Sequence, residues 1–165
     1  MKIMGIDPSI NHTGWGCIDT SNSNGELVHM NSGVIIPANW EATGNERYRR
    51  IAVELFRIMT LPVPDLVVVE WPTFEESARG RDLVKKKGLT KLCAVAGGCV
   101  AVAAVHGIPY ALVTAWQWKG KTPKPLIKLR VEELLDEREW AREDAWEALG
   151  LALWANKNRA ILETY

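Results

Sequence analysis

The chain opens with Lys2-Ile3-Met4-Gly5-Ile6-Asp7 and returns through Pro8-Ser9 to Thr13-Gly14-Trp15-Gly16. The first run is apolar and contains β-branched residues, which predicts a covered β-strand that ends at Asp7. Pro8, Ser9 and Gly14 are turn formers, so a tight, glycine-framed return to a second strand over 15–20 is expected. An isolated Asp at such a place is most simply a turn cap. Three further acids in similar settings favour a functional site instead.

The rest of the chain alternates between strands and helices. Three more strands are predicted by apolar runs, at 26–36, 66–69 and 108–114. Helices are predicted by apolar side chains at three- and four-residue spacing or by helix-favouring composition, over 45–59, 89–106, 125–135 and 142–156. Hairpins join antiparallel strands, whereas helical crossovers join parallel ones. The sequence therefore predicts a single α/β domain over residues 1–165, with a mixed five-stranded sheet flanked by helices on both sides.

The composition is that of an ordinary globular domain. Of 165 residues, 47% are apolar and 24% are charged, and the formal net charge is +0, so no global charge indicates a polyanionic partner. The three cysteines lack zinc or disulfide spacing. No signal-peptide pattern is seen, and the apolar run Leu92–Val105 is shorter than the roughly 20 residues of a membrane span. We interpret that run as a buried helix and expect a cytoplasmic protein with no membrane association.

Four acids are expected to converge at one edge of the sheet. Asp7 ends the first strand, and Glu70 ends the fourth, which can be its neighbour. In the last predicted helix, Asp144 and Glu147 share one face with an apolar stripe that must pack on the sheet. The helix dipole alone explains the acid at Glu143. It explains Glu147 poorly, because Glu147 lies within the stripe that becomes buried.

Such a group of carboxylates requires cations. Like charges raise each other's pKa and resist burial together. Carboxylates with retained water are the ligands that Mg²⁺ prefers, and two such ions about 3.5–4 Å apart are used for in-line phosphodiester cleavage. We therefore expect two Mg²⁺ ions per site, with Mn²⁺ as a substitute, held by Asp7, Glu70, Asp144 and Glu147.

Four motifs together resemble the RuvC-type Holliday junction resolvases of the ribonuclease H-like superfamily. They are Gly-Ile-Asp-Pro-Ser with Thr-Gly-Trp-Gly, Val-Val-Val-Glu, Trp118-Lys119-Gly120 with Lys124, and Asp-Ala-Trp-Glu-Ala-Leu. They extend from Met1 to about Ala155, and their order and intervals make the resemblance specific. It implies a ribonuclease H-like fold and a metal-dependent, structure-selective endonuclease. Such an enzyme resolves four-way junctions as a homodimer by paired nicks that leave 5′-phosphate and 3′-hydroxyl ends.

The resemblance also implies roles for individual residues. It places the four acids at the family's catalytic positions, although the last of them, Glu147, is usually Asp. Lys119 and Lys124 occupy basic positions that the family uses near the scissile phosphate. Phe74 is the best candidate for the family's junction-probing aromatic residue, and Trp71 is an alternative. The pattern is compatible with a bacterial or a phage-encoded protein.

Two basic segments flank the acids despite the zero net charge. The first contains Arg79, Arg81, Lys85, Lys86, Lys87 and Lys91, and the second contains Lys119, Lys121, Lys124, Lys128 and Arg130. A basic run is usually a solvated face. Because the first run follows Glu70 and the second precedes Asp144, a phosphate track for branched DNA is favoured.

Several alternatives stay open. An actin-like ATPase or a sugar kinase shares the Gly-Ile-Asp opening but needs two domains and a second glycine-rich phosphate loop, and a catalytically silent junction-binding protein would not need all four acids. Trp71, Trp116 and Trp118 either stack on bases or pack internally, with packing favoured. Gly97-Gly98 allows close approach of the long helix, either to the sheet or to a second copy of the chain.

Overall fold

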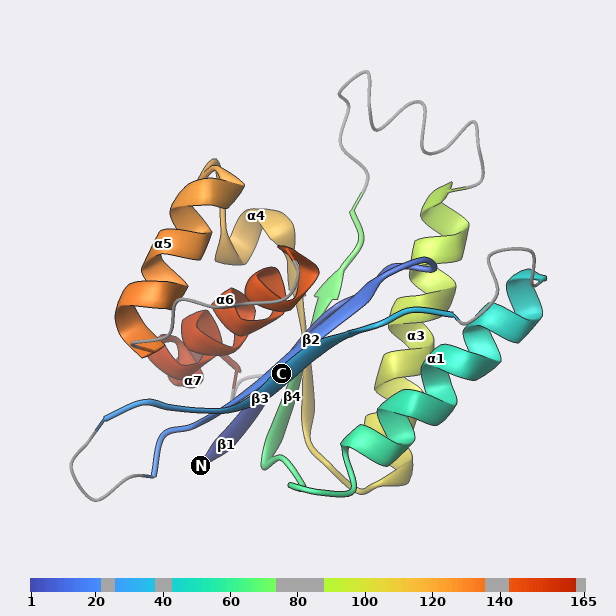
Figure 1. Ribbon diagram of the computed structural model, residues 1–165, viewed down its shortest axis with the longest axis horizontal. Helices are drawn as coiled ribbons and strands as arrows, with labels where there is room; N and C mark the ends of the chain where they lie inside the picture. Colours follow the sequence, from blue (N-terminus) through green and yellow to red (C-terminus); the bar gives the residue numbers. More distant parts are fainter. Residues whose placement is uncertain (22–25, 38–42, 74–87, 136–142, 163–165) are drawn as a thin grey trace.

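Five strands form one mixed sheet in the order β3-β2-β1-β4-β5 (Figure 1). The structure is a computed structural model that describes residues 1–21, 26–37, 43–73, 88–135 and 143–162. The strands are β1 (Lys2–Asp7), β2 (Thr13–Asp19), β3 (Val28–Ile35), β4 (Leu66–Trp71) and β5 (Tyr110–Thr114). β1 pairs antiparallel with β2 and parallel with β4, and β4 pairs parallel with β5. The predicted mixed sheet and the adjacency of the first and fourth strands are confirmed.

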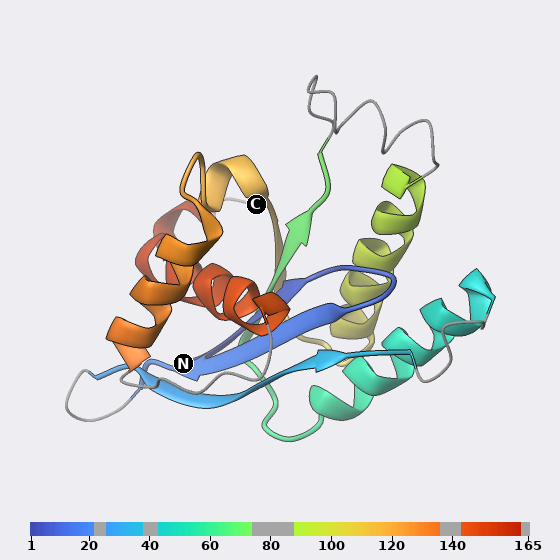
Figure 2. The same cartoon turned by 45° about the horizontal axis from the view of Figure 1, so that its top comes forward.

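Helices cover both faces of this sheet, as predicted (Figures 1 and 2). They are α1 (Gly44–Ile58), α3 (Gly88–Val105), α4 (Ala115–Trp118), α5 (Lys124–Leu135), α6 (Glu143–Lys157) and α7 (Arg159–Leu162). The short helices α4 and α7 were not predicted, because a single turn carries too little periodicity to be read from sequence.

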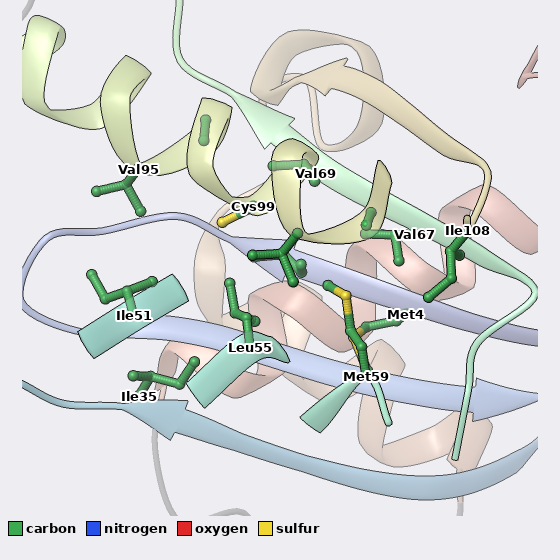
Figure 3. Close-up of a cluster of buried hydrophobic side chains, with 14 of the residues drawn as sticks. Met4, Ile35, Ile51, Leu55, Met59, Val67, Val69, Val95, Cys99 and Ile108 are labelled. Carbon is green, nitrogen blue, oxygen red and sulfur yellow. The ribbon is translucent and has the colours of Figure 1, made fainter. Parts of the chain in front are cut away.

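Alternate side chains of the central strands pack into two separate hydrophobic cores. Met4 and Ile6 of β1 point to one face and pack with α1 and α3, as Figure 3 shows for the larger members of that cluster. Ile3 points to the other face and packs with Val68 and with apolar residues of α5 and α6. This alternation follows from the two-residue period of a strand, and it fixes which helices lie on each side.

Glycines in β1 and β2 allow α6 to lie directly on the sheet. A Cβ at Gly5 would be 2.0 Å from the carbonyl oxygen of Ala148, and one at Gly14 would be 2.0 Å from that of Asp144. Gly14 lies inside β2, paired with Asp7, so the expectation that it frames the turn is wrong. Because Gly14 has no side chain, the backbone of α6 can approach β2 closely, and this brings the first turn of α6 to the end of β1.

Helix α3 is buried on one side only, which corrects the expectation of a buried helix. A Cβ at Gly97 or Gly98 would meet no atom within 4 Å, and Val105 is 75% exposed. The prediction that this glycine pair packs against the sheet is therefore wrong. Among the described residues, α3 is the one helix whose length and composition suit a membrane crossing, but it packs here against α1 and β4, as core helices of domains do.

Candidate active site

A cleft of about 460 Å³ lies at the carboxyl ends of β1 and β4, beside the start of α6. All six residues predicted to act in catalysis line it: Asp7, Glu70, Asp144, Glu147, Lys119 and Lys124. The structure thus brings together groups that are up to 140 positions apart in the sequence.

Strand register and helix packing together account for this convergence. Ile6 of β1 pairs with Val69 of β4, so the next residues, Asp7 and Glu70, emerge side by side at one edge. Asp144 and Glu147 occupy the first turns of α6, one turn apart and therefore on one face. Glu147 is only 4% exposed, which confirms that it belongs to the buried stripe.

Two lysines bridge the acids directly. The Lys119 ammonium donates to Glu70 Oε2 at 3.1 Å and to Glu147 Oε1 at 2.9 Å. The Lys124 ammonium donates to Glu147 Oε2 at 2.7 Å and forms an ion pair with Glu143 at 3.1 Å. Both oxygens of the buried Glu147 carboxylate are therefore paired with positive charge, which is the condition for burying an ionised acid.

Asp7 is in the opposite electrostatic situation. Burial raises its pKa well above the ordinary range, the nearby carboxylates of Glu70 and Glu147 raise it further, and Lys119 opposes them. Within the described residues its carboxylate accepts no hydrogen bond from a side chain or a backbone amide. Asp7 is thus an acid that lacks the counter-charge its ionised form requires.

The pKa values of Asp144 and Glu147, the two acids on α6, also depend on burial and on nearby charges. Burial also raises the pKa of Asp144, against the opposing charges of His12 and Lys124. Burial acts to raise the pKa of Glu147 too, but the hydrogen bonds and charges of Lys124 and Lys119 outweigh it, and the net shift is downward. Positive charge is therefore concentrated at Glu147 and deficient at Asp7 and Asp144.

The donor set suits hard divalent cations in type and number. Four carboxylates line one cleft, and oxygen ligands are those that Mg²⁺ and Mn²⁺ prefer. In the part of the chain that the structure describes, no three His, Cys, Asp or Glu side chains are grouped closely enough to hold an ion together. Lys119 lies between Glu70 and Glu147, so a cation at these acids requires the ammonium group to move away.

Trp118 is a site residue that sequence reasoning missed. Its indole N–H donates to Glu70 Oε2 at 2.6 Å, in addition to the packing that the sequence favoured. A capping box between Thr114 and Gln117 starts α4 directly after β5 and so delivers Trp118 and Lys119 to the cleft. Adjacency to Lys119 was the one available signal. His12 is exposed, and its charge acts to lower the pKa of Asp144.

The predicted DNA-binding residues are distributed unevenly. Those that lie outside the described residues are Phe74, Arg79, Arg81, Lys85, Lys86 and Lys87. Lys91 and Lys121 are exposed. Lys128 is half-buried, pairs with Glu132 at 3.5 Å and lies 3.9 Å from the Trp146 ring centroid. Trp71 lines the cleft but also packs against the core beneath α3.

Comparison with known proteins identifies the family. The crossover junction endodeoxyribonuclease RuvC of Geotalea uraniireducens is 31% identical over 173 residues, an alignment that covers 98% of this chain and 91% of that protein. The chain belongs to the RuvC family. The RuvC of Syntrophotalea carbinolica is 32% identical, with 93% of this chain and 92% of that protein covered. No protein-family model matches the chain.

Solved structures of resolvases superpose on nearly the whole of this chain. Thermus thermophilus RuvC in complex with a Holliday junction substrate superposes with a TM-score of 0.78 at 22% identity, covering 98% of this chain and 96% of that one. The yeast mitochondrial Holliday junction resolvase Ydc2 superposes with a TM-score of 0.63 at 12% identity, covering 99% of this chain and 82% of that one. These likenesses confirm the predicted ribonuclease H-like fold class.

Proposed function

We propose that this protein is a metal-dependent, structure-selective DNA endonuclease that resolves four-way junctions by paired symmetric nicks. The observation that carries the proposal is the single cleft in which four carboxylates and two lysines meet in a chain of the RuvC family. We place the enzyme in the cytoplasm of a bacterial or phage-infected cell.

Each group in the cleft has a distinct part in this reaction. Asp7, Glu70, Asp144 and Glu147 would hold two Mg²⁺ ions, or Mn²⁺ in their place, which would supply an activated water and stabilise the leaving 3′-oxygen. Lys119 and Lys124 donate hydrogen bonds to charge that develops on the phosphate. Both lysines pair with Glu147 in the free protein, and the Lys119 ammonium would turn from the acids towards the phosphate when metal ions bind.

Cleavage of a synthetic four-way junction tests the function. We expect paired nicks with 5′-phosphate ends in Mg²⁺ or Mn²⁺, and binding without cleavage in Ca²⁺, with duplex, flap and ATP as controls. Glu147→Gln should abolish cleavage. Glu143→Gln is the matched control, since Glu143 also pairs with Lys124 but is exposed. Binding without cleavage in every metal would favour a silent junction-binding protein, and ATP hydrolysis would favour the ATPase alternative.

Salt dependence tests the DNA track. Lys91 is exposed on the first turns of α3, whose Leu89 and Leu92 line the cleft. Each phosphate contact contributes about −0.9 to the slope of log K against log salt on B-DNA. Lys91→Ala should therefore flatten the slope by about one contact. Lys157→Ala, a change on the far end of α6, should leave the slope unchanged, and equal slopes for the two variants would remove Lys91 from the track.

A homodimer matches the two-fold strand symmetry of a four-way junction. An apolar groove of about 410 Å³ runs between α1 and α3, lined by Ala52, Val53, Phe56, Gly98, Ala101, Val102 and Val105 together with Arg57. We propose that a second copy of the chain covers it, because two cuts on opposite strands require two equivalent sites. Ala101→Asp should give a monomer by sedimentation with little loss of thermal stability, since Ala101 is exposed. A dimer unaffected by this change would move the interface elsewhere.

A further inference from the structure

The Trp118 side chain connects the second core of the protein to the candidate metal site. Its Nε1 lies 2.6 Å from Glu70 Oε2, and the Lys119 ammonium lies 3.1 Å from the same oxygen. Both donors therefore converge on one oxygen of the carboxylate. Within the described residues, no hydrogen bond reaches the other oxygen, Oε1.

The indole ring is held in place from behind. Trp118 packs against the apolar cluster formed by the sheet, α5 and α6. A Cβ at Gly150 of α6 would lie 3.1 Å from the ring carbon Cζ3 of Trp118 and 3.0 Å from Ile127 Cγ2. The ring thus occupies space that a glycine at position 150 leaves open, and the packing sets the direction of its N–H bond.

The two donors differ in what they do to a cation. The indole N–H is neutral and can only donate, so it fixes the orientation of Glu70 without cancelling its charge. The Lys119 ammonium neutralises that charge and competes with any metal ion. Partners of this neutral kind, which hold a ligating carboxylate from behind, tune metal sites strongly.

We propose that Trp118 is a positioning residue that holds Glu70 by its Oε2 atom and keeps Oε1 available to a metal ion. The proposal rests on the proposed metal site. It extends that site by a residue that acts on the metal ion through Glu70. Gly150 contributes to the same positioning, because its lack of a side chain leaves room for the Trp118 ring.

Metal titration of the Trp118→Phe variant tests the proposal without any cleavage assay. Phe keeps most of the ring packing and removes the N–H. We expect Mn²⁺ affinity, measured by calorimetry on the DNA-free protein, to fall about tenfold. Trp154→Phe is the matched control, because Trp154 lines the same cavity behind Trp118, and it should leave the affinity unchanged. Equal Mn²⁺ affinities for Trp118→Phe and the unaltered protein would overturn the proposal.

A double-mutant cycle separates positioning from general loosening of the fold. In a Glu70→Gln background, Trp118→Phe should cause no further loss of Mn²⁺ affinity, since the oriented ligand is already gone. Losses that simply add would assign Trp118 to packing and overturn the proposal. Failure of the unaltered protein to bind Mn²⁺ would instead sink the proposed function, so the two failures are distinguishable.

Two further measurements cover the case in which Trp118→Phe does not fold. Gly150→Ala should push the ring by a few tenths of an ångström and weaken Mn²⁺ binding in the same direction, though less. In the unaltered protein, the indole N–H resonance of Trp118 should move when Mg²⁺ is added, whereas that of Trp154 should not. An unchanged affinity in Gly150→Ala, or a Trp118 resonance indifferent to Mg²⁺, would contradict the proposal.

Discussion

Replacing Asp7 with Asn should stabilise the metal-free protein while abolishing cleavage. The pKa of Asp7 is raised by burial and by its carboxylate neighbours Glu70 and Glu147. A carboxyl group whose folded pKa lies above its unfolded pKa contributes stability below the unfolded pKa and loses it as the pH rises through the folded pKa. At a pH above both values, the ionised Asp7 therefore destabilises the fold, and an uncharged side chain of the same size does not.

The size of the effect follows from the same linkage. Each pKa unit between the folded and unfolded values corresponds to about 1.4 kcal/mol. With about 2.1 cal/mol/K of unfolding entropy per residue, a chain of 165 residues has about 0.35 kcal/mol/K. Each unit is therefore equivalent to about 4 °C in the melting temperature. Scanning calorimetry resolves a change of this size.

The assay compares melting temperatures with and without metal. In EDTA at about pH 8, Asp7→Asn should melt above the unaltered protein. In Mn²⁺ the unaltered protein should gain stability by mass action, and the variant should gain much less. Asp19→Asn is a control of opposite sign, because hydrogen bonds from Ser21 lower the pKa of Asp19 to about 2, and its loss should reduce the melting temperature.

Two results would refute this reasoning. If the melting temperature of Asp7→Asn in EDTA is equal to or lower than that of the unaltered protein, the ionised Asp7 carboxylate does not destabilise the fold. If the variant cuts junctions at the ordinary rate, Asp7 is not part of the catalytic site. The first result concerns the energetics of the cleft and the second concerns its chemistry, so the two are read independently.

Three further outcomes are expected. Glu147→Asp should retain substantial cleavage and Glu147→Gln very little, because the charge at this position matters more than one methylene; similar rates for the two variants would contradict this. Gly5→Ala should lower the free energy of unfolding by about 1–3 kcal/mol or more, since its Cβ meets the Ala148 carbonyl oxygen. Gly97→Ala, at an open helical position, should instead stabilise the protein by up to about 1 kcal/mol; equal urea midpoints would refute the contrast. Apparent Mn²⁺ affinity should rise with pH through the raised pKa of Asp7, because protons and metal compete for one carboxylate. A flat calorimetric profile between pH 5 and 8 would contradict it.

Much of the fold and site could be predicted because the signals are local. Strand and helix periodicity placed β1, β4 and α6 within a few residues of their observed bounds. An acid at the end of a parallel strand must emerge at the same edge as its neighbour's acid, and the three-residue spacing of Asp144 and Glu147 puts both on one face. These inferences need only the geometry of the regular elements.

Other features depended on distances between segments that the sequence does not order. Gly14 suggested a turn, and only the packed structure shows that Gly14 and Gly5 admit α6. Helix α3 has the apolar composition of a buried helix, but its exposed side could not be known before its neighbours were placed.

The sequence by itself determined which residues carry charge at the ends of β1, β4 and α6, because those positions follow from short-range periodicity. The tertiary structure decided how the charges are balanced. It pairs Lys119 and Lys124 with Glu147, gives Glu70 a neutral indole donor, and leaves the Asp7 carboxylate without a directly paired cation among the described residues. Electrostatic and hydrogen-bond energies depend on separations of a few ångströms between side chains far apart in the chain. Those separations exist only once the sheet and α6 have packed together.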